Sequence, residues 1–235
     1  MLVFGPTSDL LMVAPQMFGS KPFMSDPEID LILGWIGKEH TMLEWGSGVS
    51  TIFFSQRVRR YFSIEHDPQW HWPLADKLFR LKLDNVRLFL VPPNQTLDGL
   101  PNYARPSAER YAQFRDYVDQ VAKLGVARFD RVLIDGRSRP ECAKKVLPYL
   151  STTSIVFIHD YFNTQYERAE YHRLVAEDYE TVDEIREGQS LAVLRPKTEG
   201  MVRKSTRLYG GAELGCFGQS PGWLPQAGLL PAPRR

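Results

Sequence analysis

The sequence carries almost no net charge. Its 29 lysine and arginine residues are matched by 28 aspartate and glutamate residues, which leaves a formal net charge of +1. Nonspecific binding to nucleic acid or to anionic membranes depends on an excess of positive charge. We therefore expect neither a nucleic-acid nor a membrane partner, and a small or neutral molecule is favoured. The sequence indicates no oligomeric state.

Cysteine is scarce as well. Only Cys142 and Cys216 are present, and they lie far apart in the chain. This spacing suits neither a disulfide framework nor a zinc site built from paired cysteines. A reducing compartment is the simplest setting, and we expect a cytoplasmic protein.

Long uninterrupted apolar runs are also missing. The first 20 residues are apolar, but they lack a basic segment and contain Pro6, Asp9 and Pro15, which argues against a signal peptide or a membrane span. Residues 198–235 hold seven glycines and four prolines with little apolar periodicity, which predicts a mostly disordered tail. We expect one domain over residues 27–197, between an N-terminal extension (1–26) and the tail (198–235).

The middle of the chain alternates between two hydrophobic patterns. Short runs rich in β-branched and aromatic residues predict strands, and apolar residues at steps of three and four predict helices between them. The strands are expected at 41–45, 60–65, 85–91, 129–135, 154–160 and 190–195, and the helices at 27–38, 50–57, 69–82, 108–124, 140–150 and 166–178. Such alternation specifies a doubly wound α/β fold, with a mostly parallel sheet and helices on both faces.

Polar residues follow four of the predicted strands. In sheets of this kind, ligands bind beyond the carboxyl ends of the strands, where the strand order reverses. The four groups are Glu44 with Gly46, Ser47 and Gly48; Glu65 with His66 and Asp67; Asp135 with Gly136 and Arg137; and His159 with Asp160.

The first of these groups lies in the stretch "MLEWGSGVST". Gly46 and Gly48 permit a tight turn, and a helix that starts near Ser50 offers unpaired N–H groups to a polar ligand. An ordinary strand-to-helix turn would have the same form. Glu65, however, ends the next strand 19 residues after Gly46, where nucleoside sites place a carboxylate on the ribose hydroxyls.

The same stretch disfavours a phosphate ligand. A dinucleotide site has a third glycine near position 51, where this chain has Thr51. A carboxylate at Glu44 would repel a pyrophosphate and would suit a cationic ligand, such as an amino-acid ammonium or a sulfonium. The chain also lacks the Gly-Lys-Ser/Thr sequence of a triphosphate site.

Four segments resemble the successive motifs of class I S-adenosylmethionine-dependent methyltransferases, in particular the small-molecule or sugar O-methyltransferase-like groups. They are "LEWGSGVST", "YFSIEHDPQW", "FDRVLIDGRSRPECAKKVLPYL" and "SIVFIHDYF". The resemblance spans roughly residues 41–196 and implies a seven-stranded sheet whose last strand is antiparallel. It also implies methyl transfer from S-adenosylmethionine to a small-molecule or sugar acceptor.

The resemblance implies roles for individual residues. Glu44, Gly46, Ser47 and Gly48 would surround the methionine part of the cofactor, Glu65 would bind the ribose, His66 and Trp70 would lie near the adenine, and Asp135 would lie near the sulfonium or the substrate with Arg137 beside it. Other interpretations remain open, because Trp70 and Trp72 could pack a helix, and Arg137 and Arg139 could pair locally.

Catalytic residues are expected at the last two of these strand ends. His159 is a candidate general base because its ordinary pKa lies near neutrality, although it could instead be hydrogen-bonded within the strand end. Asp160 could orient its neighbours or act as the base. Asp135 and Asp160 could also hold a divalent metal, as in the catechol-type methyltransferases that the chain resembles more distantly. The third ligand of that group, an asparagine directly after the second aspartate, is replaced by Tyr161, and Asn163 comes two residues later.

The acceptor site is expected under a lid. Residues 92–107 are long, polar and rich in turn residues, and they leave a strand at its carboxyl end. Tyr103, Arg105, Tyr111 and Arg115 could line a pocket there, or the segment could be a surface insertion. Two other functions fit the fold: an NAD(P)-dependent oxidoreductase, and a catalytically inactive nucleoside-binding or interaction module.

Overall fold

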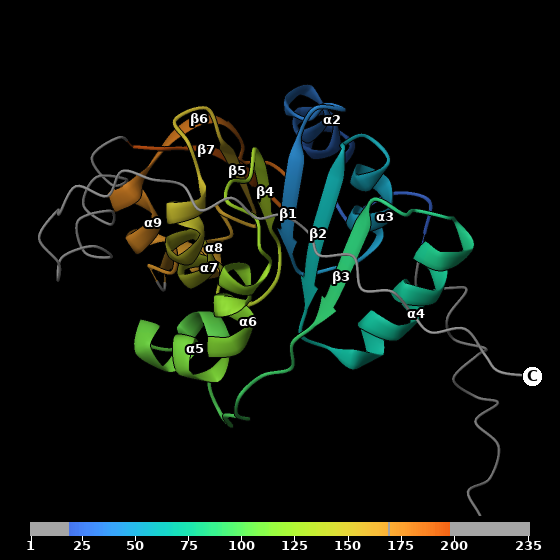
Figure 1. The fold of residues 1–235 in the computed structure, drawn as a ribbon. Coiled ribbons are helices and arrows are strands. Elements are labelled where there is room, and N and C mark those ends of the chain that lie inside the picture. Colours follow the sequence, from blue (N-terminus) through green and yellow to red (C-terminus); the bar gives the residue numbers. More distant parts are fainter. Residues whose placement is uncertain (1–18, 169, 198–235) are drawn as a thin grey trace, which may run out of the picture.

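The computed structural model describes residues 19–168 and 170–197, which form a seven-stranded sheet flanked by helices (Figure 1). The strand order is β3-β2-β1-β4-β5-β7-β6. The strands are β1 (Thr41–Trp45), β2 (Arg60–Glu65), β3 (Val86–Leu90), β4 (Arg131–Ile134), β5 (Ile155–His159), β6 (Tyr179–Ile185) and β7 (Leu191–Pro196). The doubly wound α/β fold predicted from the sequence is confirmed.

The sheet is parallel except at β7. Strands β1 to β5 pair in parallel, and β7 runs antiparallel between β5 and β6. This is the seven-stranded arrangement with an antiparallel last strand that the resemblance implied. From β1 the chain adds strands toward one edge of the sheet, and from β4 it adds them toward the other, so the strand order reverses between these two central strands. A ligand is expected at that switch point.

Periodicity located six of the seven strands and missed β6. This strand lies at the edge of the sheet, its sequence YETVDEI is mostly polar, and a bulge interrupts its pairing between Thr181 and Asp183. Most of its side chains are exposed or half-buried, so it lacks the apolar run that marks a buried strand.

The helices cover both faces of the sheet. They are α2 (Asp26–Trp35), α3 (Val49–Ser55), α4 (Pro68–Arg80), α5 (Ser107–Gln113), α6 (Arg115–Asp119), α7 (Arg139–Val146), α8 (Thr164–Arg168) and α9 (Arg173–Asp178), with short 3₁₀ helices at Asn102–Ala104, Gln120–Lys123 and Leu147–Tyr149. Apolar residues of α2 and α3 pack with one set of strand side chains, and those of α6, α7 and α9 pack with the other.

Strand alternation sorts the core into these two layers. On β5, Ile155 and Phe157 belong to the cluster with α2 and α3, whereas Val156 and Ile158 belong to the cluster with α6 and α7. Successive side chains of a strand point to opposite faces. His159 is the next residue on the same face as Ile155 and Phe157, so its side chain is expected on the α2 side.

Two predicted helices are interrupted. The predicted helix at 108–124 breaks at Phe114, whose φ of −124° is not helical, and Phe114 packs edge-to-face against His66 at 5.4 Å. The predicted helix at 166–178 is divided into α8 and α9, with Glu170 at a positive φ of 48° between them. The apolar spacing identified the buried face in the first case, because Phe114, Val118 and Val121, which recur at steps of three and four, are buried.

The domain begins earlier than predicted. Met24 is buried in the core with Ile29 and Ile32 of α2, so residues just before position 27 belong to the domain and not to an extension. The predicted disordered tail (198–235) and residues 1–18 lie outside the described residues. Within the described part of the chain, no helix has both the length and the apolar character needed to cross a bilayer.

Candidate functional site

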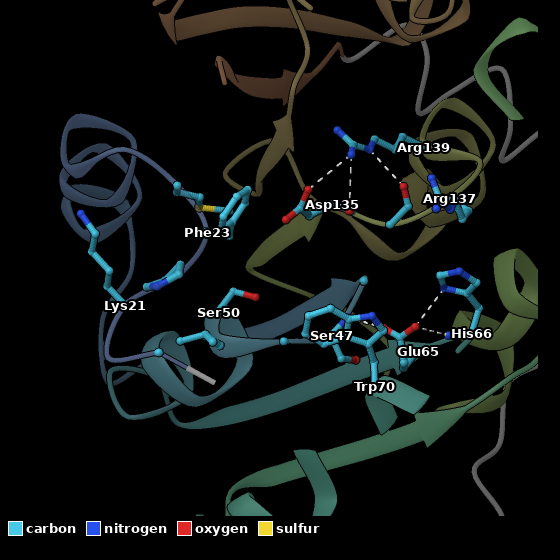
Figure 2. Close-up of a pocket in the computed structure, with 17 residues that line it drawn as sticks. Lys21, Phe23, Ser47, Ser50, Glu65, His66, Trp70, Asp135, Arg137 and Arg139 are labelled. Carbon is cyan, nitrogen blue, oxygen red and sulfur yellow. Dashed lines mark hydrogen bonds and ion pairs between the residues drawn. The ribbon is translucent and has the colours of Figure 1, made fainter. Parts of the chain in front are cut away.

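A cavity of about 670 Å³ opens at the switch point, at the carboxyl ends of β1, β2 and β4 (Figure 2). Its lining combines the three strand ends with a segment that precedes α2. The lining residues are Gly19, Lys21, Pro22, Phe23, Met24, Gly46, Ser47, Gly48, Val49, Ser50, Glu65, His66, Trp70, Asp135, Gly136, Arg137 and Arg139. The volume lies within the range of about 300–1,000 Å³ that is typical of small-molecule sites.

Gly46 shapes the floor of the cavity. Its φ is +92°, and a Cβ atom added there would lie 2.6 Å from the backbone nitrogen of Gly136. The loops after β1 and β4 therefore meet backbone to backbone, which only glycine permits at this position. Gly48 has an extended φ of −179° and open space beside it, so its role differs from that of Gly46.

Glu65 is fixed by the loops around it. Its Oε2 accepts a hydrogen bond from the backbone N–H of Ser47 (2.8 Å), and its Oε1 accepts from those of His66 and Asp67 (2.8 Å each). Burial alone would raise the pKa of this carboxyl, but His66 and the backbone donors outweigh it and lower the pKa. Glu65 is thus an ionised acceptor, held at the cavity wall with a fixed orientation.

Glu44 does not contact the cavity, contrary to the prediction. It is completely buried on the α3 side of β1, and its carboxylate accepts hydrogen bonds from the hydroxyls of Ser50 (2.6 Å), Thr51 (2.5 Å) and Ser63 (2.6 Å). Burial raises its pKa to about 7, against the opposing effect of these three donors. Glu44 therefore supports the glycine turn from below and is not placed to meet a cationic ligand.

Thr51 explains why a third glycine is absent. Besides donating to Glu44, its hydroxyl accepts a hydrogen bond from the backbone N–H of Gly48 at 3.0 Å. The side chain therefore ties the turn to the buried carboxylate. A glycine at position 51 would remove both bonds.

His66 and Trp70 line the cavity beside Glu65 (Figure 2). The His66 ring packs edge-to-face on Phe114 (5.4 Å) and Tyr117 (5.6 Å). Trp70 is 41% exposed and offers an apolar face to the cavity mouth, whereas Trp72 is 63% exposed and lies outside the lining. Neither tryptophan belongs to the buried core, and Trp72 packs edge-to-face on His71 of the same helix at 4.8 Å.

A cluster of charged groups occupies the ends of β4 and β5. Nδ1 of His159 lies 2.9 Å from Oδ1 of Asp135, and the Arg139 guanidinium lies 3.4 Å from Asp135 and 3.0 Å from Asp160. Arg139 also donates to the carbonyl oxygen of His159. Arg139, the first residue of α7, thus pairs locally with Asp135, as one of the two interpretations of this residue predicted. It also lines the cavity. Arg137 is exposed at the cavity edge.

Of the three predicted catalytic residues, only Asp135 lines the cavity. The His159 side chain is 4% exposed and turned toward α2, so the structure does not place it as a base in contact with an acceptor. Burial lowers its pKa, but Asp135 and Asp160 outweigh this effect and raise it. Asp160 is engaged with Arg139 and also lies outside the lining.

The two predicted metal ligands, Asp135 and Asp160, lie close together, but a cationic side chain lies between them. Ligand atoms of Asp135, Asp160 and also His159 lie within 4.8 Å of one another. The Arg139 guanidinium contacts both carboxylates, and His159 pairs with Asp135. Because a divalent ion would be repelled by the guanidinium in this position, the donor set does not fit a resident metal.

Sequence reasoning missed one wall of the cavity. Residues 21–24, here called the N-terminal wall, line it from the side of α2, and Lys21 pairs with Asp26 at 2.6 Å. One signal was available: Ser25 and Glu28 form a capping box, which marks the start of a helix at Asp26 and brings the preceding residues into the domain.

Hydrogen bonds within the predicted lid, residues 92–107, hold this segment in place. Arg105 is buried, and its guanidinium donates to the carbonyl oxygens of Leu97 (3.0 Å) and Asp98 (2.7 Å). Tyr103 packs against Tyr166 of α8 at 5.1 Å. The four residues suggested for an acceptor pocket, Tyr103, Arg105, Tyr111 and Arg115, are all outside the lining of the main cavity.

The strand order and the antiparallel β7 define a Rossmann-like fold with a cavity at its switch point. Solved structures share it: a methyltransferase-like protein from Silicibacter pomeroyi DSS-3 has a TM-score of 0.55 and 20% identity, over 82% of this chain and 97% of that one. A methyltransferase candidate from Streptococcus mutans, in complex with S-adenosylhomocysteine, has a TM-score of 0.51 and 13% identity, over 75% of this chain and all of that one. No protein-family model and no curated protein matches the chain.

Proposed function

We propose that this chain is an S-adenosylmethionine-dependent methyltransferase. The observation that carries the proposal is Glu65, an ionised carboxylate fixed by three backbone N–H groups at the wall of the cavity, beside the Gly46 turn. A carboxylate at this strand end is suited to the two hydroxyls of a ribose. The fold shared with the two structures above supports the same assignment.

The lining residues fit the parts of this cofactor. Glu65 would accept hydrogen bonds from the ribose, and His66 and Trp70 offer flat aromatic rings for the adenine. The loop 46–50 presents backbone groups to the methionine end. Asp135 supplies a negative charge near the centre of the lining, where it would attract a cationic sulfonium.

When bound, S-adenosylmethionine supplies a methyl group activated by positive sulfur. The protein residues contribute mainly by positioning, which can supply about 7–11 kcal/mol in favourable intramolecular cases. The side chain that would face the reacting centre is Asp135, whose pKa is raised by burial but lowered overall by His159 and Arg139. It acts as a fixed negative charge in the cavity. In transfer to a hydroxyl oxygen, the acceptor would release its proton to Asp135 or to water as the oxygen takes the methyl group.

We propose a small hydroxylated molecule or a sugar as the acceptor, with transfer to oxygen. The balanced charge of the chain supports this over a polyanion. Methyl transfer to a panel of phenols, sugars and short RNAs would decide the class, and RNA as the preferred acceptor would overturn this part of the proposal. Binding of cofactor without transfer to any acceptor would favour the inactive-module alternative.

Calorimetric titration with S-adenosylmethionine and S-adenosylhomocysteine tests the cofactor assignment. We expect both to bind the wild type, and Glu65→Gln to bind about 10–100-fold more weakly, because a hydrogen bond to a charged group contributes about 1.5–3 kcal/mol. Glu180→Gln, an exposed carboxylate of edge strand β6, is the matched control and should bind as the wild type does.

Two outcomes would contradict the proposal. Binding of NADH in place of S-adenosylmethionine would favour the oxidoreductase alternative. Equal affinity of Glu65→Gln and the wild type would remove the ribose assignment. Urea unfolding of each variant shows whether a loss of binding is merely a loss of fold.

A further inference from the structure

Two buried polar atoms face each other between α2 and β5 without a hydrogen bond. Oε1 of Glu28 and Nε2 of His159 are 3.9 Å apart, and their side chains are 0% and 4% exposed. Among the described residues, neither atom has a hydrogen-bond partner. Buried polar groups are nearly always satisfied, so a pair of this kind calls for a physical explanation.

The other oxygen of Glu28 holds the N-terminal wall. Oε2 accepts hydrogen bonds from the backbone N–H of Ser25 (2.7 Å) and from its hydroxyl (2.8 Å). Ser25 directly follows residues 21–24, which line the cavity, and Met24 anchors them in the core. The position of Glu28 therefore sets where the wall ends.

The other nitrogen of His159 holds the opposite side of the cavity. Nδ1 lies 2.9 Å from Oδ1 of Asp135, which lines the cavity after β4. His159 occupies the face of β5 that packs with α2, as the alternation with Ile155 and Phe157 requires. A continuous set of contacts thus runs from the wall through Ser25, Glu28 and His159 to Asp135.

The charges around His159 favour its protonated ring. It faces Glu28 from α2, Asp135 after β4 (2.9 Å) and Asp160 after β5 (3.8 Å), while the one cation beside it in the described part of the chain is Arg139 of α7. Three carboxylates against one guanidinium leave an excess of negative charge. An imidazolium reduces this excess and gives both ring nitrogens a proton to direct at a carboxylate.

We propose that Glu28 and the imidazolium of His159 form a buried ion pair that positions the N-terminal wall and Asp135 relative to each other, and thereby shapes the cavity for its ligand. Glu28 and His159 are positioning residues, since neither lines the cavity. The inference rests on the proposed function only for the identity of the ligand used to test it.

A double-mutant cycle with S-adenosylhomocysteine measures the pairing. Glu28→Gln and His159→Gln should each weaken binding about tenfold, and the double variant should bind about as well as either single one, because coupled residues are not additive. Asp30→Asn removes an exposed charge from the same helix and should leave the affinity unchanged. Fully additive losses would overturn the proposal.

The pH profile of binding separates positioning from mere packing. In the wild type, the affinity should fall as pH rises and His159 loses its proton. This fall should be absent in His159→Gln. If His159→Gln shows the same fall of affinity with rising pH, the proposal is contradicted.

Two measurements need no ligand. Nitrogen NMR of the wild type at neutral pH should show both ring nitrogens of His159 protonated, and a neutral ring would overturn the proposal even if the variants fail to fold. Amide exchange over residues 21–25 should be faster in Glu28→Gln than in Asp30→Asn, and equal rates would count against the proposal. If these results hold but the wild type binds no S-adenosylhomocysteine, the proposed function fails and the ion pair stands.

Discussion

Glu44 and Asp135 are carboxylates at the ends of neighbouring strands, and the protein satisfies them by opposite means. Glu44 receives three neutral hydroxyl donors, whereas Asp135 is paired with His159 and Arg139. The pKa of Glu44 is raised to about 7 by burial, and that of Asp135 is lowered because the two cationic partners outweigh its burial.

The difference shows what each kind of partner can do. Hydroxyls satisfy the geometry of a buried carboxylate but do not offset the full cost of removing its charge from water. A guanidinium and an imidazolium do offset it, and they keep the charge in place at the cavity. The β1 end is therefore built to support a turn, and the β4 end to present a negative charge to a ligand.

Removing the guanidinium of Arg139, which pairs with Asp135, should have the largest of the expected effects on stability. We expect Arg139→Met to lose about 3–5 kcal/mol of unfolding free energy at neutral pH, because Asp135 and Asp160 would keep their charges without this partner. Urea denaturation measures the loss. Arg173→Met removes an exposed arginine that is paired with Glu170 and should lose less than about 1 kcal/mol. A loss for Arg139→Met no larger than this control would show that the cluster is not held by charge.

Replacing Glu44 should change how stability depends on pH. The pKa of Glu44 in the folded state, about 7, lies above its ordinary value of 4.5. Its protonated form is therefore favoured by folding, and stability is lost as pH rises from about 4.5 through 7, by on the order of 3 kcal/mol. Glu44→Gln should lack this decline when urea unfolding is measured from pH 5 to pH 8.

The control for this experiment is Glu180→Gln, an exposed carboxylate on β6. Its stability should follow that of the wild type across the pH range. If the curve of Glu44→Gln also runs parallel to that of the wild type, the hydroxyl donors offset the cost of burying the charge of Glu44, and the contrast with Asp135 is wrong.

Chelation of divalent metals should have the smallest effect. Because Arg139 already occupies the space between Asp135 and Asp160, we expect EDTA to change neither the melting temperature nor the affinity for S-adenosylhomocysteine. Differential scanning fluorimetry and calorimetry measure the two quantities. If EDTA lowers the melting temperature or the affinity and added magnesium restores it, the charges at the β4 end are arranged for a metal.

The strands show how much local pattern can predict. The bounds of β1 and β2 agree with the sequence prediction, because a buried parallel strand is a continuous apolar run that ends at a polar residue. The four polar strand ends were found for the same reason. The edge strand β6 and the break at Phe114 were not, since pairing at a sheet edge and packing on His66 depend on residues distant in sequence.

The sequence by itself determined the doubly wound fold, the Gly46 turn and the placement of Glu65 beside it, because each depends on periodicity or on short spacing along the chain. Only the tertiary structure decided which way the side chains turn at those strand ends. Glu44 lies beneath the turn and His159 faces α2, although both end strands beside the cavity. The physical reason is that alternation along a strand fixes which residues share a face, while the helices that pack on the sheet decide what that face meets.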